Sequence, residues 1–243
     1  MAKGKIYIGT SGWNYKHWSG NFYPEDLKQK DWLKFYSDKL KTVEINNSFY
    51  HLPAIKTFRD WNVITPKNFT FSVKGNRYIT HMKKLRDPKQ SCKKLFSHAK
   101  HLNEKLGPFL FQLPPGWKFN KKRLEVFLKA LPGEYRYTFE FRDKTWWNDD
   151  VLELLKNFNI AFCIYQLAGE LSPEEVTADF IYIRLHGPAG KYQGNYSKKI
   201  LSRWAVTASS SQSKNLDVYI YFDNDQNGYA VRNAQELQKM LEV

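Results

Sequence analysis

Two glutamates and one histidine are the residues of this sequence best suited to move protons. Glu44, Glu140 and His186 each lie toward the end of a run in which polar and apolar residues alternate, as they do in a β-strand. Two carboxylates in one cavity can act as an acid and a base when their surroundings separate their pKa values. A histidine can act as a general base because its reference pKa is near ~6.5. These three residues are therefore the candidate catalytic groups.

A structural interpretation of the same residues stays open. Buried charges are normally paired, so Arg142 or Arg184 would neutralise Glu140, and Lys74 would neutralise Glu44. A lone histidine in a strand is more often simply hydrogen-bonded in the wall than catalytic. Even so, paired ions that line a barrel mouth often mark a ligand site.

Other residues near the predicted strand ends are candidates for binding a ligand. Positioned cations hold phosphate groups, and aromatic rings stack on the organic part of a ligand. The candidate ligand-binding residues are the cations Lys74, Arg142 and Arg184, the aromatic residues Trp13, Tyr50 and Trp146, and the polar residues Thr10, Asn46, Gln112 and Asp223.

A metal centre is a further possibility to weigh. Glu44, Glu140, His186 and Asp223 form an oxygen-rich set with one imidazole. A multinuclear zinc site needs several histidines at strand ends, but of the six histidines only His186 ends a predicted strand, with His81 in a nearby loop. We therefore predict no metal site and no cofactor, although the residues are also compatible with a single divalent ion such as magnesium.

These residues are far apart in the sequence and need a scaffold that gathers strand ends. Strand-like and helix-like segments alternate for eight rounds. The expected strands cover residues 5–10, 42–46, 69–74, 109–112, the start of 135–147, 160–165, 180–186 and 217–223. The expected helices cover residues 24–40, 55–63, 90–106, 121–131, 149–158, 197–207 and 228–241, whereas 166–179 is too polar and short for a full helix.

Alternation of this kind predicts parallel strands joined by right-handed crossovers. The length of 243 residues is close to the ~250 typical of one (β/α)8 barrel. We predict an α/β fold, a single TIM-like barrel domain over residues 1–243, with the helix after the sixth strand missing or irregular. The apolar face of each strand would lie under helices, and the polar face would point to the barrel axis and carry chemistry at the mouth, the carboxyl end of the strands.

Seven ordered motifs resemble the YecE-like family, also called domain of unknown function 72, and they span nearly the whole chain. The resemblance implies a TIM-like barrel and leaves the activity open, since the family's biochemical role is unknown. Some members have been suggested to bind DNA, by likeness of their clefts to barrel endonucleases. The motifs are Gly9-Thr10-Ser11-Gly12-Trp13, Val43-Glu44-Ile45-Asn46-Asn47-Ser48-Phe49-Tyr50, Lys74 with Thr80-His81, Phe111-Gln112-Leu113-Pro114-Pro115, Phe139-Glu140-Phe141-Arg142 with Trp146, Arg184-Leu185-His186-Gly187, and Phe222-Asp223-Asn224-Asp225 with Gly228-Tyr229-Ala230.

The formal net charge of +14 favours an anionic partner, either a nucleic acid or an anionic small molecule. Basic residues interleaved with Trp and Tyr occur in several predicted mouth loops, which suits a polyanion. Lysines are also spread over the predicted helices, so a compositional habit of the genome is an equal explanation. Two cysteines, no apolar leader and no run of ~18 apolar residues predict a cytoplasmic protein without a membrane partner. The oligomeric state is left open.

Three functions follow from these residues. The first is a mouth that binds a nucleic acid or phosphate ester and hydrolyses it. The second is a sugar-processing, glycosidase-like barrel that uses two carboxylates. The third is a binding module without catalysis.

Overall fold

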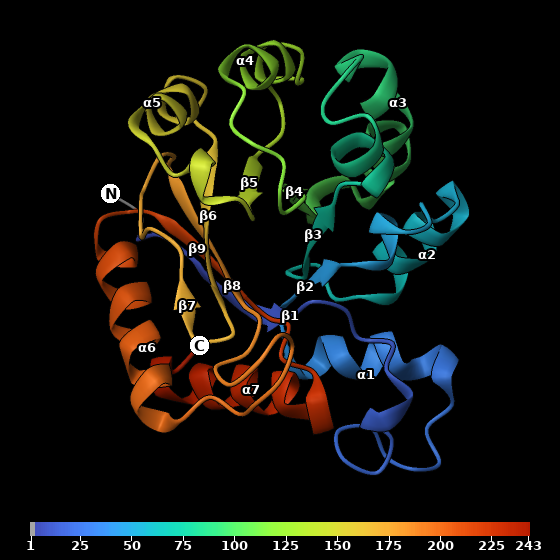
Figure 1. Cartoon of the computed structure of the whole chain (residues 1–243). Helices are drawn as coiled ribbons and strands as arrows, with labels where there is room; N and C mark the ends of the chain where they lie inside the picture. The colour runs from blue at the N-terminus through green and yellow to red at the C-terminus, as the bar shows by residue number, and fades with distance from the viewer. Residues whose placement is uncertain (1–2) are drawn as a thin grey trace.

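In the computed structural model, which describes residues 3–243, eight parallel strands form a barrel wall surrounded by helices (Figure 1). The hydrogen-bonded order is β1-β9-β8-β6-β5-β4-β3-β2. This arrangement confirms the predicted TIM-like barrel. The strands of the wall are β1 (Ile6–Thr10), β2 (Thr42–Ile45), β3 (Thr70–Lys74), β4 (Leu106–Leu113), β5 (Tyr137–Phe141), β6 (Ala161–Leu167), β8 (Phe180–Leu185) and β9 (Asp217–Phe222).

The helices follow the predicted order with changes at their ends. The helix expected over 24–40 begins only at Trp32, and the one expected over 90–106 ends at Ala99. Asn103, at φ 50°, interrupts the helical turns that follow Ala99. The α-helices are α1 (Trp32–Lys39), α2 (Ile55–Ile64), α3 (Pro88–Ala99), α4 (Lys121–Lys129), α5 (Asp149–Asn157), α6 (Lys198–Ser213) and α7 (Tyr229–Leu241).

The segment after β6 replaces a helix with a short strand. β7 (Glu170–Leu171) turns back and pairs antiparallel with the end of β6. The prediction of an irregular element over 166–179 is therefore confirmed. Within residues 3–243, no helix has both the length and the hydropathy needed to cross a bilayer.

Alternating side chains separate the two faces of the barrel wall. Val43, Ile45 and Phe139 point outward and join the large core under the helices. Tyr182 and Tyr221 belong to a second cluster on the inner face. The Tyr221 hydroxyl lies 2.7 Å from Thr42 Oγ1 and 2.8 Å from Ser72 Oγ, so hydrogen-bonded tyrosines fill the lumen below the mouth.

The seam between β1 and β2 closes the barrel by close backbone approach. These two strands stand at the ends of the pairing order, and an isolated parallel bridge joins Ser11 to Glu44. Gly9 makes the approach possible, because a Cβ at this position would lie 2.1 Å from the carbonyl oxygen of Thr42. The seam therefore brings the polar residues of β1 and β2 into one lumen.

Gly9→Ala is expected to lower the free energy of unfolding by about 1–3 kcal/mol, the range for overpacked sites, because β1 and β2 must separate to admit the methyl group. Gly133→Ala is the matched control, since a Cβ there has no heavy atom within 4 Å. Urea unfolding of both variants measures the difference. Equal midpoints for the two variants would contradict the role assigned to Gly9.

Candidate functional site

Arg184 on β8 links the acidic residues at the carboxyl end of the barrel. Its guanidinium is fully buried; Nη1 donates to Glu140 Oε2 at 2.7 Å and Nη2 donates to Glu44 Oε1 at 2.7 Å. Nη2 also lies 3.3 Å from Asp223 Oδ2. A buried arginine with five fixed donors suits such bridging because its planar fork reaches several carboxylates at once. One cation therefore gathers three acids from three different strand ends.

Glu44 has a complete set of partners around its carboxylate. Ser11 Oγ donates to Glu44 Oε1 at 2.8 Å, and the Tyr182 hydroxyl donates to Oε2 at 2.7 Å. With Arg184 as its ion-pair partner, Glu44 does not use Lys74, the neutralising partner expected from the sequence. The register between strands decides which cation pairs with Glu44. Arg184 reaches Glu44 from β8, whereas the Nζ atom of Lys74 lies over the ring of Phe49.

Glu140 is paired with two guanidiniums. The Nε atom of Arg142 donates to Oε1 and Arg184 donates to Oε2. Burial alone would raise the pKa of Glu140, but the charges of Arg142 and Arg184 hold it well below its ordinary value. Glu140 is therefore an ionised group at neutral pH.

His186 has partners on both ring nitrogens. Nδ1 lies 2.9 Å from Asp223 Oδ2, while Nε2 lies 2.9 Å from Arg142 Nη2 and 3.2 Å from Arg184 Nη1. Guanidinium nitrogens only donate, so these contacts assign the proton to Nδ1 and leave Nε2 as an acceptor. Burial would raise the pKa of Asp223, but the hydrogen bond from His186 and the charge of Arg184 lower it.

Among the described residues of the mouth, Lys74 is the cation that has no acidic partner. Its side chain is 6% exposed, and its Nζ atom lies 4.4 Å from the ring centroid of Phe49. No carboxylate oxygen in residues 3–243 lies within 4.0 Å of Nζ. Burial and the charge of Arg184 lower the pKa of Lys74 to about 8. From here on, the mouth cluster denotes Glu44, Lys74, Glu140, Arg142, Arg184, His186 and Asp223.

Thr10 is a predicted ligand residue that the structure places on the other side of the wall. Its hydroxyl lies 2.9 Å from the Tyr36 hydroxyl in α1 and donates to the Gly12 carbonyl at 2.6 Å. The lumen position belongs to the next residue, Ser11, which contacts Glu44. Strand alternation from Tyr7 through Gly9 would have identified Ser11.

Trp146 is likewise not at the mouth. It is fully buried outside the barrel wall, stacked on Phe141 with ring centroids 5.2 Å apart. Arg142 does lie at the mouth, where its guanidinium packs over the ring of Tyr165 at 4.8 Å. Gln112 is half-buried on β4, in register with Glu140. Tyr182 and Tyr165, which support the mouth cluster, were not selected by sequence reasoning.

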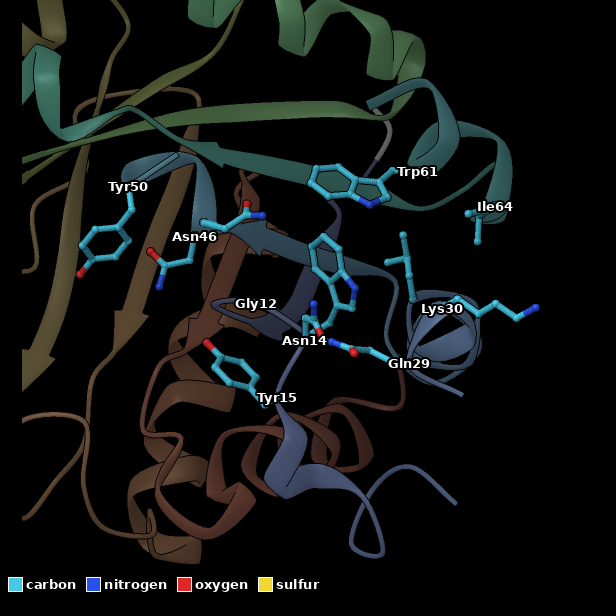
Figure 2. Close-up of a pocket in the computed structure, with 12 residues that line it drawn as sticks. Gly12, Asn14, Tyr15, Gln29, Lys30, Asn46, Tyr50, Trp61 and Ile64 are labelled. Atoms are coloured by element: carbon cyan, nitrogen blue, oxygen red, sulfur yellow. Dashed lines mark hydrogen bonds between the residues drawn. The ribbon is translucent and has the colours of Figure 1, made fainter. Parts of the chain in front are cut away.

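Beside the mouth cluster lies an aromatic pocket of about 560 Å³, which contains three predicted ligand residues: Trp13, Asn46 and Tyr50. Figure 2 shows Tyr50 and Asn46 on one side of the pocket and Trp61 on the other. The rings of Trp13 and Trp61 meet edge to face at 5.0 Å, and Tyr50 is 70% exposed. The Oδ1 atom of Asn46 is buried without a hydrogen-bond partner. Trp61 lies in α2, and the sequence pattern around it does not distinguish a pocket residue from a core residue.

A metal ion has little room in the mouth cluster. Within residues 3–243, no group of three or more His, Cys, Asp or Glu side chains has an arrangement that could hold one. Glu140 and Asp223 instead surround the guanidinium of Arg184, which occupies the central position that a cation would take.

Part of the positive charge in the mouth loops is already neutralised. Lys83 pairs with Asp87 at 3.1 Å and Lys118 with Asp143 at 3.2 Å, and at the starts of α4 and α5 Lys121 pairs with Asp150 at 2.7 Å. Exposed ion pairs of this kind are weak, so they moderate the positive potential of the loops and do not remove it.

Comparison with known proteins identifies relatives along nearly the whole chain. A family model described as "Protein of unknown function DUF72" matches residues 7–243. The UPF0759 protein YunF of Bacillus subtilis (strain 168) is 28% identical, over 98% of this chain and 95% of that protein. The UPF0759 protein YecE of Escherichia coli (strain K12) is 28% identical over 56% of this chain and 48% of that protein. A crystal structure of a DUF72 family protein from Thermotoga maritima MSB8 is 30% identical, with a TM-score of 0.88, covering 98% of this chain and all of that one.

Proposed function

Because this chain belongs to the DUF72 family, whose biochemical function is unknown, we propose a function from the geometry of the barrel mouth: it binds an anionic ligand, a phosphate ester or a nucleic acid. Lys74 and Arg142, whose side chains are 6% and 7% exposed, are the groups that meet the anion. The aromatic pocket receives the organic part of the ligand.

The observation that carries this proposal is the unpaired charge of Lys74. The three carboxylates of the mouth cluster are engaged by Arg184, Arg142 and His186. An ammonium group that is nearly buried without an anion is unfavourable, and an incoming anion relieves this cost. The three carboxylates and three cations of the mouth cluster balance in number, but Lys74 is the cation that lies beyond ion-pair distance of those acids, so it is the group placed to meet an incoming anion.

The pocket supports an organic group next to the anion. The turn η3 (Asn47–Phe49) separates the two regions: Asn47 lines the aromatic pocket, while Phe49 packs against Lys74. Aromatic walls with a few amides suit a planar ring that also hydrogen-bonds, such as a nucleobase. The side chains of Asn46 and Asn47 line this pocket and carry amide groups that can hydrogen-bond a planar ring.

We further propose that Glu44, Glu140 and His186 hold the arginines in place and do not transfer protons. A glycosidase needs one protonated carboxyl group, whereas Glu140 is held ionised by its two guanidiniums. A general base needs a free lone pair, and both nitrogens of His186 have partners. Binding is thus favoured over hydrolysis, and incubation with p-nitrophenyl phosphate tests for turnover.

Lys74→Met is expected to weaken binding of adenosine monophosphate at least about tenfold, because a hydrogen bond to a charged group contributes about 1.5–3 kcal/mol. Isothermal titration calorimetry at pH 7 measures the affinity. Lys93→Met, at an exposed position in α3, is the control and should bind as the unmodified protein does. Equal affinity of the two variants would contradict the assignment of Lys74.

Titration with single-stranded and duplex DNA across salt concentrations separates the two ligand classes. DNA binding that weakens steeply with salt and is reduced in Lys74→Met would favour the nucleic acid. Absence of DNA binding at every salt concentration, with retained nucleotide binding, would favour the phosphate ester.

A further inference from the structure

We propose that the amine of Lys74 is a nucleophile that forms an imine with an aldehyde or ketone carrying an acidic group. This inference rests on the anion site proposed above and adds the class of compound that the site takes. It also assigns the mouth a covalent step, which neither the fold nor the relatives indicate.

The position of Lys74 favours nucleophilic attack. It is the last residue of β3, at the carboxyl end of the barrel where loops from other strands converge. Its stem is buried and its Nζ atom lies over the face of Phe49, so the amine is held in one place without an acid beside it. A lysine that is desolvated, or that lies near another cation, is activated because its neutral form is favoured.

The charges around Lys74 act in both directions. Burial has the largest effect and lowers the pKa of the amine, because it favours the neutral form. The charge of Arg184 lowers this pKa further, while the carboxylates of Glu44, Asp223 and Glu140 raise it. His81 faces Lys74 from the turn after β3, and its own pKa is lowered by burial and by the Lys74 charge. With a pKa of about 8, about a tenth of Lys74 carries the reactive lone pair at pH 7.

Lys105 provides an internal contrast. It is also buried, but its Nζ donates to the carbonyl oxygens of Asn62 and Thr65 at the end of α2. Those hydrogen bonds use the ammonium protons of Lys105 to cap the carboxyl end of α2, which explains why this lysine is buried. Lys74 has no comparable set of acceptors among residues 3–243, so its burial has no such structural explanation.

The proposed step is a condensation without change of oxidation state. The neutral Nζ atom attacks the carbonyl carbon, and a carbon–nitrogen bond forms. The amine gives up its two protons to the carbonyl oxygen, which leaves as water, and the imine remains. Once Lys74 is consumed in this way, Arg142, whose side chain is 7% exposed, is the cation at the mouth that a carboxylate or phosphate on the same compound can approach, because Arg184 is fully buried among Glu44, Glu140 and Asp223.

The test is reductive trapping of the full chain with glyoxylate or pyruvate and sodium borohydride, with acetone as an uncharged ketone. Borohydride reduces an imine to a stable secondary amine, and peptide mass spectrometry locates it. We expect modification at Lys74 ahead of the exposed lysines, slower modification by acetone, and a rate that rises with pH around a midpoint of about 8. Lys74→Arg should abolish the adduct, whereas Lys93→Arg should retain it.

The outcomes separate this inference from the anion site. Adducts spread evenly over the exposed lysines, or the absence of an adduct on Lys74, would contradict the proposal that Lys74 forms an imine. If adenosine monophosphate still bound in a Lys74-dependent way, anion binding would stand alone. If neither adduct nor anion binding depended on Lys74, both proposals would fail. Circular dichroism of Lys74→Arg confirms that any loss does not come from misfolding.

Discussion

Arg184→Met is expected to lower the free energy of unfolding by about 3–5 kcal/mol, the cost of removing one partner of a buried ion pair. The change leaves Glu44, Glu140 and Asp223 facing one another without the cation that bridges them. Urea unfolding at pH 7 measures the effect. A loss below about 1 kcal/mol would show that the remaining groups pair without Arg184, against the central role assigned to it.

Two variants serve as controls for Arg184→Met. Arg59→Met removes an exposed arginine from α2 and should change stability by less than about 0.5 kcal/mol. Tyr182→Phe removes one hydrogen bond to Glu44 and should cost about 1 kcal/mol. If the loss of stability is largest for Arg184→Met, smaller for Tyr182→Phe and smallest for Arg59→Met, the effect comes from the bridging charge and not from a single hydrogen bond.

The deficit of Arg184→Met should also shrink in acid. In the unmodified protein the pKa values of Glu140 and Asp223 are depressed, so their stabilisation is present above the unfolded pKa of about 4 and is lost as pH falls through the folded values. Without Arg184, protonation of these carboxyls relieves repulsion. The unfolding free energies of the two proteins should therefore converge below about pH 4.

Lys74→Met is expected to raise the free energy of unfolding at pH 7 by on the order of 3 kcal/mol. Folding lowers the pKa of this lysine from 10.5 to about 8, and each pKa unit corresponds to about 1.4 kcal/mol. Methionine has a similar length without a charge to bury. A substitution that stabilises the fold and weakens ligand binding would identify a residue kept for function.

The pH dependence gives this prediction its sign. Between the folded pKa of about 8 and the unfolded value of 10.5, the unfolded chain binds more protons at Lys74, so the stability of the unmodified protein rises with pH in that window. In Lys74→Met this contribution is absent, and the difference between the two proteins should narrow from pH 7 to pH 10. Lys93→Met should follow the unmodified protein throughout. If Lys74→Met were less stable than the unmodified protein at pH 7, the conclusion that Lys74 is buried without an acidic partner would be contradicted.

Strand polarity could be predicted from the sequence because side chains alternate with a period of two. Arg136, Thr138 and Glu140 alternate with Tyr137 and Phe139, and Tyr137 and Phe139 lie in the core under the helices. The same rule places Ser11 in the lumen, where it contacts Glu44, and Thr10 on the outer face, where it contacts Tyr36.

The sequence by itself determined the barrel, its order of strands and helices, and the polar residues that meet at one end. These features depend on local periodicity and chain length, which are visible one segment at a time. Only the tertiary structure decided that Arg184 bridges Glu44 and Glu140, that Trp146 is core, and that Lys74 has no acidic partner in the described part of the chain, residues 3–243. Those outcomes depend on register and rotamer between strands that are distant in the chain, and no local pattern of residues encodes which cation reaches which acid.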